Sequence, residues 1–347
     1  MDADATRQPL VIANPRAGRG RTGRELPLLL EPLRSALGEV DVVLTRRPGD
    51  ARHAGVAAAA ERRPLVISLG GDGTLNEVVN GLLGGDDVPP PAASLPRLGV
   101  VAAGTGGDFG RALSIPPRFE DYVAAVAGGE DRTVDVGWAR FAGRDGRPER
   151  RLWINVLSAG IGGLVDRYTA VAPGLLPGRV AYAQATVRAI VACRRVSLRC
   201  RAVLPDESSR ERFLHAYAVA ICNGTTFGAG MRVAPMARPD DGLLEVITFE
   251  TASKLRMALR LKTLYSGRHL RQPGVNHFRC RALTLVPLPA GETRATEHRR
   301  AAQARDQSPR ALFPLDMDGD ALGDVPLDVG LLPRALRLCV PRVHPGR

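Results

Sequence analysis

Short aliphatic runs alternate with helix-forming stretches over the first 110 residues, and this alternation constrains the fold more than any other feature of the sequence. The runs predict strands at residues 10–13, 40–44, 65–69 and 98–102. After each run comes a loop rich in glycine, proline or aspartate, and then a predicted helix. Because strands that alternate with helices form parallel sheets covered by helices, we predict an open α/β domain over residues 1–133.

The pattern changes beyond about residue 134, where glycine- and proline-containing turns separate short apolar runs of strand character. These runs lie at residues 152–157, 215–222, 243–249 and 282–286, with helical patterns at 180–192 and 253–264. Residues 291–310 are polar and charged and predict a loop. We therefore predict a mainly β second domain over residues 134–334. The sequence predicts a last strand at residues 335–340, which could join either domain. The C-terminal segment 335–347 is therefore assigned to neither, and its return to the first domain is one of the two options.

Composition excludes several classes of protein. No apolar run reaches the roughly 18 residues of a membrane-spanning helix, and the N-terminal residues lack the segments of a signal peptide, so we expect a cytoplasmic protein. The five cysteines include no CxxC pair, which argues against a disulfide framework and against a thiolate zinc site. The net charge of +12 favours phosphate-bearing partners, which include nucleotides, nucleic acid and anionic lipid headgroups.

Lysine is almost absent, since Lys254 and Lys262 are the only two. A Walker A loop ends in GK[ST], and a protein kinase carries its phosphate-binding lysine on an early strand. No lysine precedes residue 254, so both of these ATP-binding architectures are excluded. A phosphate site in the first domain would have to use backbone N–H groups, arginine side chains or Mg²⁺.

Three glycine-rich loops follow predicted strands: residues 14–20, 70–74 and 104–109. Glycine lets backbone N–H groups approach an anion closely, and a helix N-terminus favours phosphate. In a parallel sheet all three loops would emerge at the carboxyl edge, which predicts a nucleotide site there. Asp72 does not itself attract phosphate, so it implies a bound Mg²⁺ or a hydroxyl acceptor nearby. The structural alternative is a tight strand-to-helix turn that Asp72 caps.

The segment SLGGDGTLNEVVNGL, residues 68–82, resembles the signature of the diacylglycerol kinase catalytic domain, which sphingosine kinases and bacterial soluble lipid kinases share. Five more blocks resemble the same family in the family's order: VIANPRAGRGR, LTRRPGDA, GVVAAGTGGDFGRAL, CNGTTFGAGMRVAPMARPDDGLLEV and DMDGD. The resemblance therefore spans nearly the whole chain. It implies a two-domain kinase that holds ATP in the cleft between an α/β nucleotide-binding domain and a β-rich lipid-substrate domain.

The resemblance also implies site residues. The residues expected to contact ATP are Asn14, Pro15, Arg16, Ala17, Gly18, Thr45, Gly70, Gly71, Asp72, Gly73, Thr74, Leu75, Asn76 and Thr105. A Mg²⁺ ion is expected on Asp241, with the backbone oxygens of Leu243 and Arg238. Asp135 and Asn155 also match family blocks, and a capping or packing role suits them equally well.

Two positions depart from the family pattern. Gly107 replaces the asparagine of GTGND, and Asp318, Gly319 and Asp320 stand where the family usually has DGE. The DGE-like block is expected to supply the base that takes the proton from the acceptor hydroxyl. Position favours Asp320 as this base, and Asp318 is the alternative. If the block has only a structural role, it is a surface turn whose carboxylates face water. Asp72 is the third expected catalytic residue, and domain closure is expected to bring it to Asp320.

These features predict a Mg²⁺-dependent ATP:lipid phosphotransferase, which would reach a hydroxyl of diacylglycerol or a related lipid at the membrane surface without spanning the membrane. Phosphorylation of a soluble acceptor, as by NAD kinases, and nucleotide binding without catalysis are the alternatives. Nucleic-acid binding lacks a reader motif. The arginines of residues 253–271, with Leu255 and Leu259, fit a membrane-contacting helix or a core helix with a solvated face. The oligomeric state is left open, a homodimer included.

Overall fold

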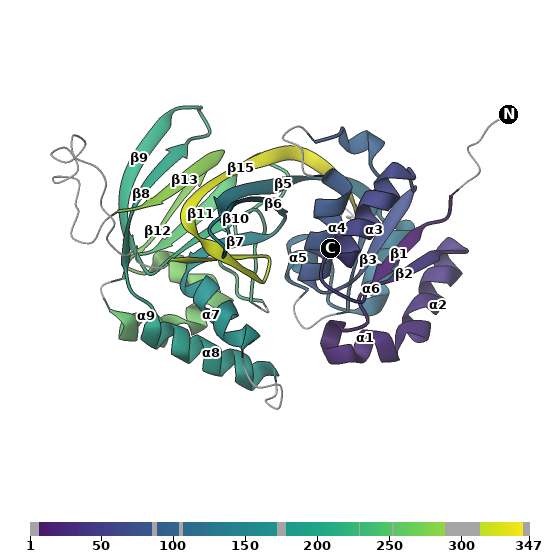
Figure 1. Cartoon of the computed structure of the whole chain (residues 1–347), viewed down its shortest axis with the longest axis horizontal. Coiled ribbons are helices and arrows are strands. Elements are labelled where there is room, and N and C mark those ends of the chain that lie inside the picture. The colour runs from purple at the N-terminus through teal and green to yellow at the C-terminus, as the bar shows by residue number, and fades with distance from the viewer. Residues whose placement is uncertain are drawn as a thin grey trace.

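The computed structural model describes residues 7–84, 89–103, 107–171, 178–228, 230–251, 253–288 and 313–342. Two lobes lie side by side, and the last strand, β15 (Asp320–Val340), arches from one to the other (Figure 1). The predicted loop at residues 291–310 and the predicted ATP contact Thr105 lie outside the described residues.

The N-terminal lobe contains four parallel strands in the order β2-β1-β3-β4, which confirms the predicted open α/β domain. The strands are β1 (Leu10–Ala13), β2 (Asp41–Leu44), β3 (Leu65–Gly70) and β4 (Arg97–Ala102). The helices are α1 (Arg21–Arg24), α2 (Leu26–Leu37), α3 (Asp50–Ala60), α4 (Asp72–Leu83), α5 (Asp108–Ala112) and α6 (Phe119–Gly128), with 3-10 turns η1 (Ala17–Gly20) and η2 (Ala92–Ser94). Because the strands are parallel, the loops after β1, β3 and β4 emerge at one edge of the sheet.

The C-terminal lobe is mainly β, as predicted, and its strand pairs are antiparallel. Its strands are β5 (Glu130–Ala142), β6 (Pro148–Trp153), β7 (Val156–Gly160), β8 (Val196–Val203), β9 (Ser209–Ala216), β10 (Ala218–Cys222), β11 (Leu244–Phe249), β12 (Val275–Cys280), β13 (Ala282–Pro287) and β14 (Pro314–Met317). Its helices are α7 (Ile161–Ala170), α8 (Gly178–Ala192), α9 (Lys254–Arg260) and α10 (Lys262–Tyr265), with the 3-10 turn η3 (Arg268–Arg271).

Two predicted runs are each divided into two strands. The run at 152–157 breaks between β6 and β7, where three successive backbone N–H groups donate to the Asp318 carboxylate instead of to a neighbouring strand. The run at 215–222 breaks at Tyr217, whose N–H donates to the Phe249 carbonyl. Beyond that break the chain changes partners, since β9 pairs with β8 whereas β10 pairs with β7 and β11.

The strand β15 connects the two lobes within one continuous sheet, in the order β12-β11-β10-β7-β14-β15-β4-β3-β1-β2. Its first half packs Leu322 and Leu327 into the apolar core of the C-terminal lobe. Its last residues, with Leu336 and Leu338 fully buried, join the core of the N-terminal lobe, and Leu338 pairs with Leu98 of β4 in parallel register. The predicted strand at 335–340 is therefore the end of a 21-residue strand.

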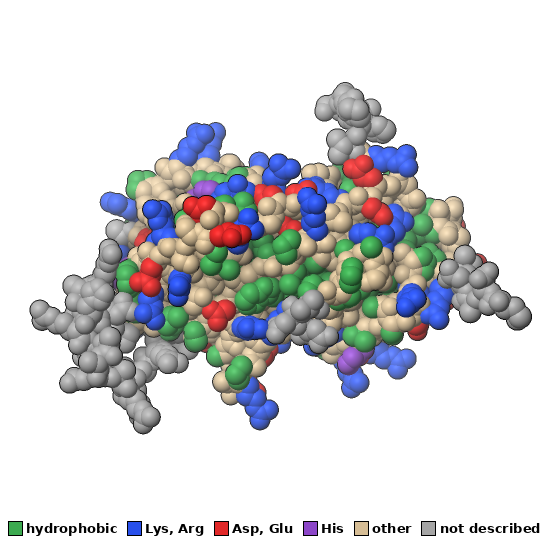
Figure 2. Space-filling view, turned by 90° about the horizontal axis from the view of Figure 1, so that it is seen from above, with side chains coloured by type: hydrophobic (Ala, Val, Ile, Leu, Met, Phe, Trp, Pro, Cys, Tyr) green, Lys and Arg blue, Asp and Glu red, His purple; other side chains and the backbone are tan. Residues whose placement is uncertain are grey.

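The five cysteines are free thiols and all are buried. Within the part of the chain that the structure describes, no helix is both long enough and apolar enough to cross a lipid bilayer. Figure 2 shows the arginine and lysine side chains spread over both lobes on the face that it views, without one dense basic patch.

Candidate active site

The glycine-rich loops after β1 and β3 are held against each other at the edge of the parallel sheet, and Ala103, directly after β4, lies against the first of them. The Asn14 amide donates to the Thr74 hydroxyl over 3.0 Å, and the Asn14 backbone N–H donates to the Leu69 carbonyl over 2.9 Å. Gly18, with φ of 58°, lies so close to the β4 loop that a Cβ there would be 2.8 Å from the Ala103 carbonyl oxygen. The structure therefore brings together the predicted contacts that follow β1 and β3.

The first turn of α4 is built for a close approach of backbone to a ligand. A Cβ on Gly70 would lie 2.6 Å from the Thr74 hydroxyl, so only glycine fits before the helix. The N-terminus of α4 has no side-chain cap, which leaves its first N–H groups available. Leu75, Val78, Val79 and Leu82 anchor the helix through one buried stripe. Free N–H groups and the helix dipole give this end of α4 the chemistry that suits a phosphate group.

Asp72, in that first turn, is partly buried beside a second carboxylate. Its Oδ2 accepts the backbone N–H of Asp108 over 3.3 Å. Burial, and then the nearby Asp108 charge, raise the pKa of Asp72 to about 6. Asp108 itself accepts the Gly230 N–H over 2.8 Å and pairs with Arg111 over 2.9 Å, and so connects this turn to the C-terminal lobe. Two carboxylates this close favour a cation between them and the phosphates.

Gly107, one of the two departures from the family pattern, begins α5 with φ of 64° and ψ of 33°. This left-handed conformation is adopted most readily by glycine and, among other residues, by asparagine. Glycine therefore preserves the backbone that the family's asparagine would form, and the loss is confined to the side-chain amide.

Asp318 is a buried anchor in the turn between β14 and β15. Its carboxylate accepts the backbone N–H groups of Ile154, Asn155 and Val156 over 2.9–3.0 Å. It also accepts the amide of Asn76, from α4, over 2.9 Å. Burial raises the pKa of Asp318, and these four donated hydrogen bonds oppose that shift. With its acceptor positions filled, Asp318 holds the turn against α4.

Asp320, at the outer side of the same turn, is exposed and faces α4. A Cβ on Gly73 would lie 3.7 Å from the Asp320 Oδ1 atom. The described residues supply no hydrogen bond or ion pair to this carboxylate. Domain closure is the predicted means of bringing Asp72 to Asp320. In this structure Asp320 already lies beside Gly73, the residue that follows Asp72, because β15 starts at Asp320 and Asp318 holds the preceding turn to α4.

Two predicted ATP contacts have side chains that are committed elsewhere. The Asn76 amide donates to the Leu152 carbonyl as well as to Asp318, and its oxygen accepts from Asn80. Leu75 is buried in the core. Only the backbone groups of these two residues can contact a nucleotide. Thr45 is buried at the end of β2, and Arg16 is exposed in the loop after β1.

The predicted metal ligand Asp241 lies away from the glycine-rich turns, at a bend that also contains Asp240. Asp241 accepts the Leu243 N–H over 3.1 Å and pairs with Arg279. Asp240 pairs with Arg132 over 2.7 Å, yet its Oδ1 atom is buried without a hydrogen bond in the described part of the chain. Carboxylate and backbone oxygens suit Mg²⁺. In this structure the Arg279 guanidinium pairs with Asp241, and the Asp240 Oδ1 atom lies 3.7 Å from the Arg238 guanidinium. No group of three or more His, Cys, Asp or Glu side chains is arranged for a metal within the described residues.

Sequence reasoning passed over Asp166 and Asp316. Asp316 is buried and accepts the Gly319 N–H over 3.1 Å and the Ser158 hydroxyl over 3.3 Å. Burial and the neighbouring Asp166 raise the pKa of Asp316 well above its ordinary value. The sequence does carry a signal for Asp316: aspartate stands at every second position in residues 316–320, which places successive carboxylates along one strand and turn.

Comparison with known proteins adds to this geometry. Residues 8–139 match the diacylglycerol kinase catalytic domain, and residues 155–340 match the YegS C-terminal NAD kinase beta sandwich-like domain. The chain is 26% identical over 333 residues to the diacylglycerol kinase of Staphylococcus haemolyticus, covering 96% of this chain and 88% of that one. It is 28% identical over 279 residues to the diacylglycerol kinase of Staphylococcus aureus strain RF122, covering 80% and 82%.

A solved structure shares the whole fold. The crystal structure of a diacylglycerol kinase from Bacillus anthracis superposes with a TM-score of 0.62 at 18% identity, over 96% of each chain. At that identity the likeness establishes the architecture alone. The two domain matches, which together span nearly the whole chain, establish more: the chain belongs to a kinase family, that of the diacylglycerol kinase catalytic domain continued by the YegS C-terminal domain.

Proposed function

We propose that this protein transfers the γ-phosphoryl group of ATP to a hydroxyl group of diacylglycerol or a related lipid. The observation that carries the proposal is the meeting of the Asp318–Asp320 turn with the first turn of α4. Asn76 and Asp318 join the two segments, and the free Asp320 carboxylate lies against Gly73. A proton acceptor thus faces a phosphate-binding helix N-terminus, which is the arrangement that phosphoryl transfer to a hydroxyl needs.

In this proposal the loop after β1, Thr45 and residues 70–76 hold ATP, with Thr105 as a further contact. The N–H groups at the start of α4 bind the phosphates, and Arg16 adds positive charge from the loop after β1. Asp241, with the backbone oxygens of Leu243 and Arg238, would hold Mg²⁺. A Mg²⁺ ion bound there would offset the negative charge of the bend that contains Asp240 and Asp241.

Asp320 is proposed to take the proton of the lipid hydroxyl as the hydroxyl oxygen attacks the γ-phosphorus and the bond to the β-phosphate oxygen breaks, releasing ADP. A positioned base contributes about 10²–10⁴-fold to such a step. Asp318 does not have this role in the proposal, because four donors already occupy it. It instead fixes the backbone that carries Asp320.

An exposed apolar surface favours a lipid acceptor over a soluble one. Val187 and Val191 of α8, and Leu255 and Leu259 of α9, are 61–72% exposed. Lys254 links the two helices by donating to the Val191 carbonyl over 2.7 Å. Exposed arginines, among them Arg256, flank these side chains. We propose that this surface, on the lower side of the C-terminal lobe in Figure 1, contacts the cytoplasmic side of a membrane.

A transfer assay tests the proposal. Purified protein is incubated with ATP labelled in the γ-phosphate and either vesicles that contain diacylglycerol or NAD in solution. We expect labelled phospholipid with the vesicles and no labelled product from NAD. Asp320→Asn is expected to abolish the label, whereas Asp328→Asn, which changes an exposed aspartate of the same strand, is the matched control and retains it. Labelled NAD would replace the lipid with a soluble acceptor, and ATP binding without any transfer would refute catalysis.

A further inference from the structure

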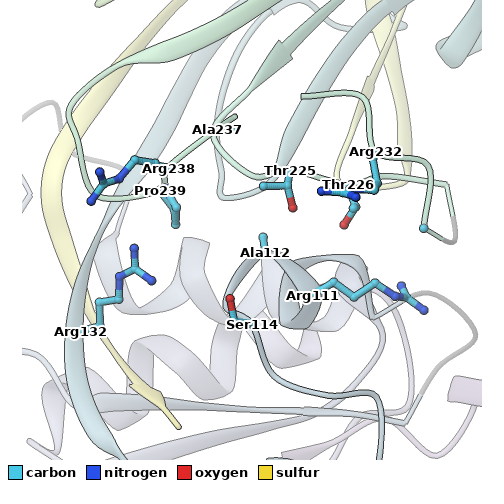
Figure 3. Close-up of a pocket in the computed structure, with 11 residues that line it drawn as sticks. Arg111, Ala112, Ser114, Arg132, Thr225, Thr226, Arg232, Ala237, Arg238 and Pro239 are labelled. Atoms are coloured by element: carbon cyan, nitrogen blue, oxygen red, sulfur yellow. The ribbon is translucent and has the colours of Figure 1, made fainter. Parts of the chain in front are cut away.

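A pocket of about 530 Å³ opens between the two lobes, outside the proposed ATP site. Figure 3 shows Arg111 of α5 and Arg132 of β5 on one side of the pocket and Arg232 and Arg238 on the opposite side. Apart from Arg238, whose backbone is a proposed metal ligand, no residue proposed for the kinase reaction lines it. Nothing in the proposed phosphoryl transfer requires four guanidinium groups at this place.

The positive charge of the pocket exceeds the negative charge paired with it. Arg111 pairs with Asp108 over 2.9 Å, whereas Arg132 and Arg238 share Asp240 over 2.7 and 3.7 Å. Arg232 has no ion pair with any residue that the structure describes, and no carboxylate lines the pocket. Uncompensated charge in a concave surface concentrates the field and attracts anions.

The shape and chemistry of the lining favour phosphate over other anions. Guanidinium groups bind phosphate oxygens in pairs, through two parallel N–H donors. Ser114 and Thr225 add hydroxyl groups from opposite sides of the pocket. The volume lies within the range of small-molecule pockets and well above that of a single phosphate group, so the ligand carries more than one phosphate or an attached organic part.

We infer that this pocket is a second anion site, which binds a phosphomonoester or a short polyphosphate through Arg232, Arg132 and Arg111. Because its arginines come from both lobes, one bound anion connects the lobes and opposes their separation. Arg111 also pairs with Asp108, which bonds to the Asp72 turn, so occupancy of the pocket is communicated to the glycine-rich turn. Binding itself requires neither ATP nor lipid phosphorylation, so it can fail or succeed independently of the proposed function.

The test is calorimetric titration of the full-length protein with inorganic pyrophosphate and, separately, with a short-chain phosphatidic acid below its micellar concentration. ADP is kept at saturation so that the proposed ATP site is filled. We expect Arg232→Gln to weaken binding about tenfold or more, since a charge-assisted contact is lost. Arg210→Gln, which removes the same charge from exposed strand β9, is the control and should leave binding unchanged. Tighter binding of one probe identifies free phosphate or a lipid headgroup as the source.

A second variant tests the site by repulsion. Ser114 has φ of 61°, a conformation that aspartate tolerates, so Ser114→Asp places a carboxylate among the arginines with little strain. We expect it to abolish pyrophosphate binding while the thermal unfolding curve stays close to that of the wild type. Equal affinities for wild type, Arg232→Gln and Ser114→Asp would overturn the inference. An equal loss in Arg210→Gln would also overturn it, because the binding would then follow net charge alone.

Discussion

The inner and outer sides of one short turn show how position assigns different tasks to the same side chain. Asp318, on the inner side, is buried and accepts four hydrogen bonds, three of them from the break between β6 and β7. Asp320, two residues away on the outer side, is exposed next to Gly73 and has no donor among the described residues. A carboxylate whose acceptor positions are filled can hold a backbone, whereas an open one can receive a proton.

The largest effect should come from removing the open carboxylate. Asp320→Asn is expected to lower kcat by about 10²–10⁴-fold, because an amide cannot accept the hydroxyl proton. Its thermal stability should be close to that of the wild type, since the side chain is exposed. Asp320→Glu restores the residue that the family usually has and should retain activity. Radiolabelled transfer to lipid measures the activity of both variants, and thermal unfolding measures the stability of Asp320→Asn. A fully active Asp320→Asn enzyme would contradict the assigned role.

Removing the filled carboxylate should mainly affect stability. Asp318→Asn turns an NH₂ group toward backbone N–H donors and leaves at least one of them unsatisfied in a buried site. We expect a loss of about 2–4 kcal/mol in the free energy of unfolding, measured by urea denaturation. Activity per folded molecule should fall less than in Asp320→Asn. A variant as stable as the wild type would show that the four hydrogen bonds do not anchor the turn.

Asp72 extends the comparison to the facing turn, where its partly buried carboxylate accepts the backbone N–H of Asp108 over 3.3 Å. The pKa of Asp72 is raised to about 6 by burial and by Asp108, so the folded protein binds this proton more tightly than the unfolded chain. The contribution of this proton to the free energy of unfolding is complete below about pH 4 and is lost as the pH rises through about 6. Asp72→Asn should therefore gain about 1–2 kcal/mol over the wild type above pH 6, and the difference should disappear at pH 4.

Thermal unfolding of wild type and Asp72→Asn from pH 4 to pH 8, without metal or nucleotide, measures this difference. Glu31→Gln, which changes an exposed acid of the same lobe, serves as a control for the loss of one negative charge. A constant difference between Asp72→Asn and wild type at all pH values would place the pKa of Asp72 near its ordinary value.

The smallest effect on the fold is expected at Gly73. Its added Cβ would meet the Asp320 Oδ1 atom at 3.7 Å, an ordinary contact, and alanine suits a helix better than glycine. Gly73→Ala should leave the fold unchanged or stabilise it by less than about 1 kcal/mol. The methyl group would nevertheless occupy the space between the proposed phosphate site and Asp320, so we expect a higher KM for ATP. Unchanged kinetics would mean that the nucleotide does not pass this point.

The sequence predicted best what short segments determine. The parallel strands and the glycine-rich turns follow from local patterns, since a strand, a turn and a helix lie within about 20 residues. The division of residues 152–157 escaped prediction because its cause is Asp318, more than 160 positions away. The length of β15 was missed because Pro326 and Pro333 interrupt the strand pattern, and its pairing with β5 compensates for them.

The candidate site was predicted unevenly for the same reason. Residue types and order placed the glycine-rich loops and the Asp318–Asp320 turn in one family of sites. They could not tell which aspartate is buried, since this depends on donors from Asn76 and from the break between β6 and β7. The four arginines of the pocket between the lobes come from separate segments, and only the packing of the lobes brings them together.

The path of β15 has a consequence for synthesis on the ribosome. One of the two neighbours of β4 in the sheet, β15, is the last strand to be translated, and its Leu338 follows its β4 partner Leu98 by 240 positions. Until those residues emerge, the nascent N-terminal lobe exposes β4 as an open edge and lacks the apolar side chains that Leu336 and Leu338 bring to its core. A premature stop in the final tenth of the message therefore damages the lobe that was made first.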